Sequence, residues 1–562
     1  MKPYAVTIKR DVPAADVEAI AQHVRELPST TVRKSLFGGH ILLLSSTGSA
    51  LSELEQDPRL VSVTDLTEMP PMAITEPNRN TEPKKLRQVQ PMAPLGGSAS
   101  VLPPWPKPWK LSGEYTYGLE ALGADVVHSK IGVDFAGQGV GVCILDSGLD
   151  INHPEFKGIN LKGYLDFLES RSPIDPISHG THVAGTIVAP LGEGAINRPV
   201  EVGSGGVVGI APNVNLYVGR ILRADTEASV LDWWGSFLSS IDWCTNQLAS
   251  RGGSEKHMVM NLSLGGIYDR SSFFDPFEFA FEQFALDGGI TIAGAGNDTF
   301  DISADPTKIY FPAGLPSVVA VSSISSVGQL SWFSNFGSKI DLAAPGEAIF
   351  STATKSGGYM IGTMSAKGLA PFNTVVPARK SVAKTVKDMD IVAASRGTSE
   401  LPGSLCDGPD ATLAGKIALI YAWKCPLKTK VDNAVKSGAL ALILHNIDDD
   451  MGAANYDDGK GGSSPIPVVL INYDDGQRLK NTLPKKGTVS VTGSADYAVA
   501  SGTSMAAPHV TGAAALVWSQ KPSLTASELL QLLKRTATDL GASGKDDEYG
   551  YGVVNPLAAI EE

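Results

Sequence analysis

The chain has 562 residues, too many for one hydrophobic core, so we expect two to four domains. Hydrophobic residues make up 43% and charged residues 19%, a globular composition, and the formal net charge is −13. Nucleic acids and anionic membranes bind through clustered lysine and arginine, so this charge argues against both as partners. No apolar stretch in the sequence reaches the roughly 18 to 20 residues that a membrane-spanning helix needs.

Residues 1–67 have the pattern of a small α+β module. A strand-like alternation at 4–8 precedes a helical pattern at 17–24, two strands around Gly38-Gly39, a short helix near 51–55 and a strand through 61–63. The order strand-helix-strand-strand-helix-strand is that of a ferredoxin-like module. Prolines then punctuate residues 68–111 without sustained periodicity, which is typical of a linker.

From residue 112 apolar strands alternate with helical patterns. The expected strands are 140–145, 258–262 and 290–293, and the expected helices are 179–189, 229–250, 275–287 and 505–519. This alternation predicts a doubly wound, mostly parallel α/β sheet over 112–365 and 496–562, with sites at the carboxyl ends of its strands. Residues 366–495 interrupt it with strands of their own at 416–421, 439–444 and 468–471, so we expect an inserted β-rich domain.

The four cysteines fall into two groups. Cys143 and Cys244 stand in apolar surroundings and are interpreted as packed thiols. Cys406 and Cys425 lie 19 residues apart in the insert and are predicted to form a disulfide. The N-terminus lacks the apolar core of a secretory signal, so either the chain stays inside the cell or its signal is absent from this sequence.

Three segments each place one reactive side chain among small residues. In the segment 140–148, Asp146 follows the end of an apolar strand. In the segment 178–186, His179 opens a helix, and in the segment 501–510, Ser504 opens another. A serine hydroxyl needs an imidazole to take its proton and a carboxylate to hold that imidazole in the correct tautomer. In a fourth segment, 293–298, the Asn297 amide could donate to an oxyanion beside the backbone N–H of Ser504.

These motifs, in the order Asp, His, Ser, resemble the subtilisin family, and the resemblance runs through 112–561 apart from the insert, including 550–555. It implies a secreted serine endopeptidase that acts as a monomer on proteins or peptides through an acyl-enzyme and needs no cofactor for the chemistry. It also implies a substrate-binding strand edge and walls of the primary specificity pocket, made by Ser263, Leu264, Gly265, Gly266, Ala293, Gly294, Ala295 and Gly296. Neither motif holds an acidic residue to select lysine or arginine, so an open pocket with broad apolar preference is expected.

The N-terminal module and the insert also resemble domains that accompany the catalytic domain in this family. The module at 1–67 is similar to the family's inhibitor-type propeptide, which acts as intramolecular chaperone and inhibitor and is removed by self-cleavage, here between about Thr67 and Gly113. The insert resembles a protease-associated domain at 415–420, 430–434 and 438–443, together with Cys425. In the family this domain is credited with influencing substrate access or partner contact.

Alternatives stay open beside these interpretations. A subtilisin-like enzyme could perform restricted processing or acyl transfer, and a binding or decoy protein could keep the fold without turnover. His182 and Asp150 are interpreted as structural neighbours of the motifs, and Ser365 in the motif echo 362–366 as structural. Calcium could bind near Glu155 or at the acidic run 448–458, although a solvated loop is the favoured interpretation of that run.

Overall fold

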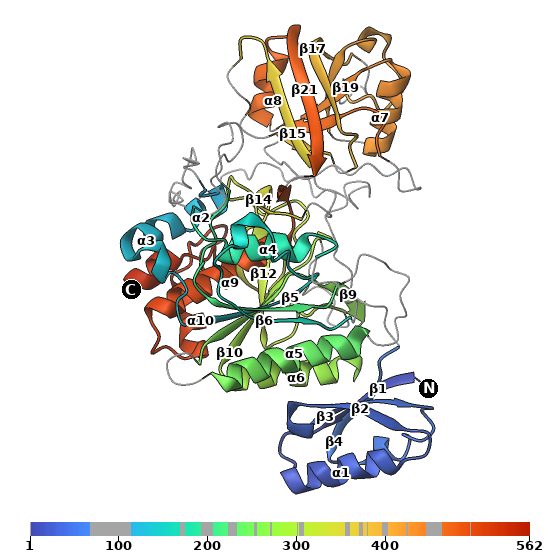
Figure 1. Ribbon diagram of the computed structural model, residues 1–562, viewed down its shortest axis with the longest axis vertical. Helices are drawn as coiled ribbons and strands as arrows, with labels where there is room; N and C mark the ends of the chain where they lie inside the picture. The colour runs from blue at the N-terminus through green and yellow to red at the C-terminus, as the bar shows by residue number, and fades with distance from the viewer. Residues whose placement is uncertain are drawn as a thin grey trace.

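The computed structural model contains three units, drawn from bottom to top in Figure 1. The N-terminal module lies beneath helices α5 (Trp233–Ser250) and α6 (Asp275–Leu286), the parallel-sheet domain (114–354 and 496–562) occupies the middle, and the inserted domain lies above it. The structure describes residues 2–67, 114–168, 175–192, 206–222, 233–251, 256–269, 272–299, 302, 308–354, 360–369, 372, 375–378, 380–395, 403–422, 425–445, 463–471, 473–494 and 496–562.

The N-terminal module is a four-stranded antiparallel sheet covered by one helix. Its elements are β1 (Lys2–Ile8), α1 (Ala14–Glu26), β2 (Thr31–Leu36), β3 (Ile41–Ser46) and β4 (Leu60–Asp65), with strand order β2-β3-β1-β4. The expected second helix is only a 3₁₀ turn at Leu54–Gln56. Alternate residues of β1 face opposite sides: Val6 packs in the module's own core with α1, whereas Ala5 joins the core that contains α5 and α6.

Seven parallel strands form the central sheet in the order β13-β12-β10-β8-β5-β7-β6. They are β5 (Gly141–Asp146), β6 (Leu161–Asp166), β7 (Asn215–Arg220), β8 (Met258–Leu262), β10 (Gly289–Gly294), β12 (Val318–Ile324) and β13 (Ile340–Pro345). The predicted strands 140–145, 258–262 and 290–293 correspond to β5, β8 and β10, which are neighbours in this sheet. The doubly wound α/β class expected from the sequence is confirmed.

Helices cover both faces of this sheet. Val142 and Ile144 of β5 share a core with α4 (His179–Val188) and α9 (Thr503–Gln520), whereas Cys143 and Leu145 share the other core with α5 and α6. Strands buried on both faces need this continuous apolar sequence, which is why β5 shows no polar alternation. The remaining helices are α2 (Tyr117–Ala121), α3 (Ala124–Ile131), α10 (Ala526–Arg535) and α11 (Pro556–Glu561).

The inserted domain has a mixed seven-stranded sheet in the order β15-β21-β17-β18-β19-β20-β16. Its elements are β15 (Met360–Ala366), β16 (Val375–Pro377), β17 (Lys384–Ala393), β18 (Ile417–Tyr421), α7 (Leu427–Lys436), β19 (Ala441–His445), β20 (Val468–Ile471), α8 (Tyr473–Lys480) and β21 (Lys485–Ser494). Because β15 pairs with β21, this sheet begins at Met360, earlier than the boundary at 366 expected from the sequence.

Two short antiparallel strand pairs complete the parallel-sheet domain. β14 (Ile349–Thr352) precedes the insert and β22 (Tyr497–Ala500) follows it, and the two strands pair with each other. β9 (Gly266–Asp269) pairs with β11 (Lys308–Phe311).

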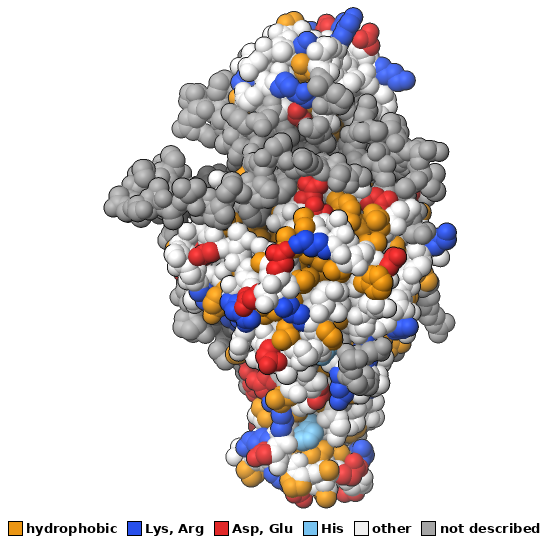
Figure 2. All heavy atoms as spheres, turned by 90° about the vertical axis from the view of Figure 1, so that its left-hand side faces the viewer, with side chains coloured by type: hydrophobic (Ala, Val, Ile, Leu, Met, Phe, Trp, Pro, Cys, Tyr) orange, Lys and Arg blue, Asp and Glu red, His pale blue; other side chains and the backbone are white. Residues whose placement is uncertain are grey.

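On the face shown in Figure 2, acidic and basic side chains are interspersed, and the N-terminal module forms the narrow lower end. Within the described ranges, no helix is both long and apolar enough to cross a bilayer.

Both cysteine pairs are disulfide-bonded. Cys406 is joined to Cys425, and Cys143 on β5 is joined to Cys244 on α5. The interpretation of Cys143 and Cys244 as packed thiols is therefore wrong: the strand and the helix that covers it hold the two Cα atoms 6.2 Å apart, within disulfide range. No motif links residues separated by 101 positions, so the sequence alone carried no signal for this pair.

Loss of the two disulfides should have unequal effects on stability. A cross-link stabilises chiefly by restricting the unfolded chain, so the 101-residue separation of Cys143 and Cys244 is worth about 4–5 kcal/mol and the 19-residue separation of Cys406 and Cys425 about 3 kcal/mol. We expect the Cys143→Ala/Cys244→Ala variant to lower the melting temperature of the parallel-sheet domain. This decrease should exceed the decrease that Cys406→Ala/Cys425→Ala causes in the melting temperature of the inserted domain. Equal or reversed losses in calorimetry would contradict this.

Candidate active site

Asp146 is a fully buried carboxylate at the end of β5. Its Oδ1 accepts a hydrogen bond from Nδ1 of His179 at 2.8 Å and another from the backbone N–H of Ser147 at 2.6 Å. An ionised group at such a position is tolerated when donors face it. The pair therefore fixes which imidazole nitrogen carries a proton: Nδ1 donates to Asp146, leaving Nε2 as the acceptor.

His179 is the first residue of α4, and tight packing holds this helix end against the end of β5. A Cβ on Gly180 would lie 2.3 Å from the carbonyl oxygen of Gly148, so only glycine permits the approach. The turn before the helix is held by Asp175, which accepts from the backbone N–H groups of Ser178 and Thr181, both at 2.9 Å. Sequence reasoning missed Asp175, because it stands four residues before the helix start and not at the N-cap position, which Ser178 occupies.

Ser504 lies in the first turn of α9, tied to the end of β8 by two reciprocal hydrogen bonds. Its Oγ donates to the carbonyl oxygen of Ser263 at 3.0 Å, and the Oγ of Ser263 donates to the carbonyl oxygen of Ser504 at 2.7 Å. This turn is thus fixed in position, while the Ser504 hydroxyl can rotate about one bond. That rotation is needed before the hydroxyl can donate to an imidazole.

Asn297 follows β10 and contacts the same turn. Its Oδ1 accepts from the backbone N–H of Thr503 at 2.8 Å and from the Thr503 hydroxyl at 3.0 Å. The acceptor end of the amide faces Thr503 in this way, and the NH₂ group is the donor end that an oxyanion would need.

All four groups converge through the topology of the sheet. β10, β8 and β5 are adjacent parallel strands, so Asn297, Ser263 and Asp146 extend from the same carboxyl edge. The packing of α4 against α9 brings the two helices that carry His179 and Ser504 together on one face. A hydroxyl, an oriented imidazole, a buried carboxylate and an amide donor at one edge are the groups needed for acyl transfer.

Comparison with known families gives the assignment. The family model described as Subtilase family matches residues 137–374 and 474–552, more than half of the chain. The chain belongs to the subtilase family. A second model, described as PA domain, matches residues 387–479 within the inserted domain, as the protease-associated resemblance implied.

Individual relatives agree with this assignment. The chain is 32% identical over 238 residues to Subtilisin NAT of Bacillus subtilis subsp. natto, covering 42% of this chain and 53% of the relative. It is also 32% identical over 238 residues to a subtilisin of Bacillus pumilus, covering 74% of that protein. The solved psychrophilic subtilisin-like protease Apa1 from Pseudoalteromonas sp. AS-11 matches with a TM-score of 0.61 and 27% identity, over 80% of this chain and 98% of that one. The chain spans about half the length of the first curated relatives it matches.

The predicted pocket walls of this subtilase are not separated by open space. The ring of Tyr310, on β11, lies between Gly265 and Gly296: a Cβ on Gly265 would lie 2.6 Å from Tyr310 Cε1, and one on Gly296 would lie 2.3 Å from its Cζ. Tyr310 is only 2% exposed. An aromatic ring therefore stands between two glycines of the walls where the sequence predicted an open pocket.

The structural neighbours singled out from the sequence lie apart from the chemistry. The Nε2 of His182 contacts the carbonyl oxygens of Ile349 and Ala498, one on each strand of the β14–β22 pair, and burial lowers the pKa of this histidine to about 3. Asp150 accepts a loop N–H from Asn152 at 3.1 Å. Ser365 is exposed on β15 of the inserted domain.

Glu155 is engaged by another part of the chain. Its side chain is fully buried, and Oε1 accepts a hydrogen bond from the Tyr497 hydroxyl at 2.6 Å. Among the residues that the structure describes, no group of three acidic, histidine or cysteine side chains is placed to hold a metal ion. The acidic run at 448–458 lies outside the described residues.

Proposed function

We propose that this subtilase is a serine endopeptidase that hydrolyses peptide bonds through an acyl-enzyme on Ser504. The observation that carries the proposal is the buried His179–Asp146 hydrogen bond of 2.8 Å at the sheet edge to which Ser504 is also tied. Ser504 attacks the peptide carbonyl carbon while Nε2 of His179 takes the hydroxyl proton. The same imidazole then gives that proton to the leaving amine, and a water molecule repeats the sequence to release the acid.

The remaining groups act on charge and orientation. Asp146 holds the imidazole in its productive tautomer and stabilises the imidazolium that forms. Asn297 and the backbone N–H of Ser504 donate to the oxyanion of the tetrahedral intermediate. The strand edge at 263–266 binds the backbone of an extended peptide substrate, and the segment 293–296 lines the opposite side. None of these steps draws on a cofactor.

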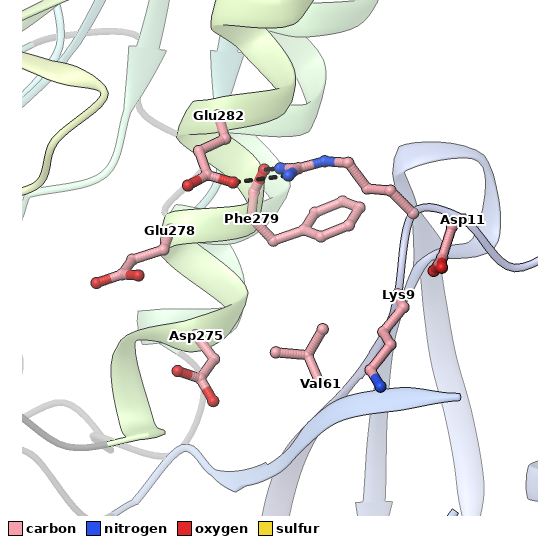
Figure 3. Close-up of a pocket in the computed structure, with 8 residues that line it drawn as sticks. Lys9, Asp11, Val61, Asp275, Glu278, Phe279 and Glu282 are labelled. Carbon is pink, nitrogen blue, oxygen red and sulfur yellow. Dashed lines mark hydrogen bonds and ion pairs between the residues drawn. The ribbon is translucent and has the colours of Figure 1, made fainter. Parts of the chain in front are cut away.

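The N-terminal module acts, in this proposal, as an inhibitory propeptide removed by self-cleavage. Its support is the contact of the module with α5 and α6. Arg10 donates to Glu282 and to the carbonyl oxygen of Phe279, both at 2.6 Å, and its guanidinium lies over the Phe279 ring. In Figure 3, Phe279 points from α6 towards the module beside Val61. The backbone N–H of Phe37 donates to Asp242 of α5 at 2.6 Å.

Secretion is proposed from the cysteine chemistry as well as from the family. All four cysteines of the chain are paired in disulfides. Disulfides persist in oxidising compartments and are rare in the cytosol, so this pairing favours an extracellular protein. We further propose that the enzyme acts as a monomer on protein or peptide substrates, with neither nucleic acid nor membrane as partner.

A time course of purified wild type and Ser504→Ala, followed by intact-mass spectrometry with casein present, tests this function. We expect wild type to lose its N-terminal module by a cut between about Thr67 and Gly113 and to degrade casein, while Ser504→Ala stays whole and leaves casein intact. Casein that survives even after the module has been trimmed by an added protease would favour the decoy alternative. Cleavage confined to one site would favour restricted processing.

Replacing Asn297 with alanine should lower kcat by about 10²- to 10³-fold, the loss that removal of an oxyanion-hole asparagine causes in subtilisin. KM should change little, because the amide acts on charge that develops only in the transition state. Steady-state kinetics on a peptide ester or amide check this. A loss as large as that of Ser504→Ala would contradict the assigned role.

A further inference from the structure

The space beside Ser504 that would receive a substrate side chain is closed by a residue of the chain itself. The carbonyl carbon that Ser504 attacks is bonded to the Cα of one substrate residue, so the side chain of that residue must lie within a few ångströms of Ser504. Two segments flank this position: Ser263 bonds to Ser504, and the backbone N–H of Gly296 donates to the Thr503 hydroxyl at 2.9 Å. The acceptor pocket for the attacked residue therefore lies between 263–266 and 293–296.

Tyr310 occupies that space from wall to wall. One ring edge, Cε1 and Cδ1, faces Gly265, where an added Cβ would lie 2.6 and 3.2 Å away. The opposite edge, Cζ and Cε2, faces Gly296, where an added Cβ would lie 2.3 and 2.5 Å away. The glycines on both sides are thus in contact with the ring, so the ring takes up the space between them that a substrate side chain would enter.

The backbone that carries Tyr310 is held in place. Tyr310 pairs with Ile267 in the β9–β11 ladder, and its carbonyl oxygen accepts from the N–H of Gly314 at 2.8 Å. Asn335 lies beside the ring at Gly296, where an added Cβ would be 2.3 Å from its Nδ2, and this Nδ2 donates to the carbonyl oxygen of Ala295 at 3.0 Å. Because strand pairing fixes the Cα of Tyr310 and packing fixes its ring, the ring is part of the pocket wall and not a surface side chain that folds over it.

We infer that Tyr310 restricts this enzyme to peptide bonds that follow a small residue, namely glycine, alanine or serine. This inference rests on the proposed peptidase function and replaces the broad apolar preference that the open pocket would have implied. A substrate with phenylalanine or leucine before the scissile bond would have to displace a buried ring. One misfit methylene in an apolar pocket already costs about 10- to 200-fold in kcat/KM, so a whole aromatic side chain should cost at least that much.

The test is a substrate series on the processed wild-type enzyme, with peptide p-nitroanilides that differ only in having glycine, alanine, phenylalanine or leucine before the scissile bond. We expect kcat/KM for alanine to exceed that for phenylalanine by about 100-fold or more. Sequencing the casein fragments should likewise show cuts after small residues. Equal or faster cleavage after phenylalanine or leucine would overturn the inference while leaving the peptidase function intact. No hydrolysis of any substrate, with no reaction towards a fluorophosphonate, would overturn the function itself.

Two variants separate ring volume from other roles of Tyr310. Tyr310→Gly should raise kcat/KM for the phenylalanine substrate by about 100-fold or more, with a smaller change for alanine. Tyr310→Phe keeps the ring without the hydroxyl and should retain the wild-type preference. The fluorophosphonate labelling rate reports whether each variant keeps a working site. If Tyr310→Gly does not fold, the wild-type series still decides the question.

Discussion

Replacement of Ser504 by alanine is expected to lower kcat by about 10⁶-fold, the scale of loss measured for the nucleophile of subtilisin. The reason is that the acyl-enzyme forms on the Ser504 hydroxyl, which the variant lacks. Residual turnover should come only from transition-state binding by Asn297 and the substrate-binding strand. Steady-state hydrolysis of an alanine-containing peptide substrate measures the loss.

Ser365→Ala is the matched control, since this serine stands in the motif echo at 362–366. It lies exposed on β15 of the inserted domain, away from the parallel sheet that bears the active site. We expect its kcat and KM to equal those of the wild type. A large loss for Ser365→Ala with a small one for Ser504→Ala would reverse the assignment of the nucleophile.

Asp146→Asn is expected to lower kcat by about 10⁴-fold with little change in KM. The carboxylate that accepts from Nδ1 of His179 at 2.8 Å would become an uncharged amide. An amide holds the imidazole less firmly in the tautomer with its proton on Nδ1, and it cannot stabilise the imidazolium that forms when His179 takes the proton of Ser504. The same kinetic measurements, with melting temperature as the control for folding, check the result. A loss below about 10-fold would contradict the role given to Asp146.

Much of the fold could be predicted from the sequence, because the spacing of apolar residues along the chain distinguishes strands from helices. The apolar runs at 258–262 and 290–293 correspond to β8 and β10. They could be recognised because a strand buried on both faces is a nearly continuous run of apolar residues. Asp146, His179 and Ser504 could be found because each ends or begins a regular element within a run of small residues. The sheet then brings them to one edge.

What the sequence did not indicate depends on contacts between distant segments. The Cys143–Cys244 disulfide follows from α5 packing over β5, and no local pattern records that pairing. Tyr310 stands 13 residues beyond Asn297 and outside every motif, so its presence in the pocket emerges only when β11 pairs with β9. Asp175 likewise acts through a turn geometry that appears only in the folded chain.

The inserted domain is connected close to the chemistry. β22 leads into Ser504 within a few residues, and His182, three residues after His179 on α4, contacts both β22 and β14. The two strands that flank the insert are therefore in contact with α4, and β22 runs along the chain into α9.

The most direct test of the account is to label the processed enzyme with a fluorophosphonate and map the modified residue by peptide mass spectrometry. The account predicts one phosphonylated residue, Ser504, with labelling lost in Ser504→Ala, strongly slowed in His179→Ala and unchanged in Ser365→Ala. An active protease that stays unlabelled at Ser504, or that labels as fast without His179 as with it, would contradict the claim that these two residues form the nucleophile and its base.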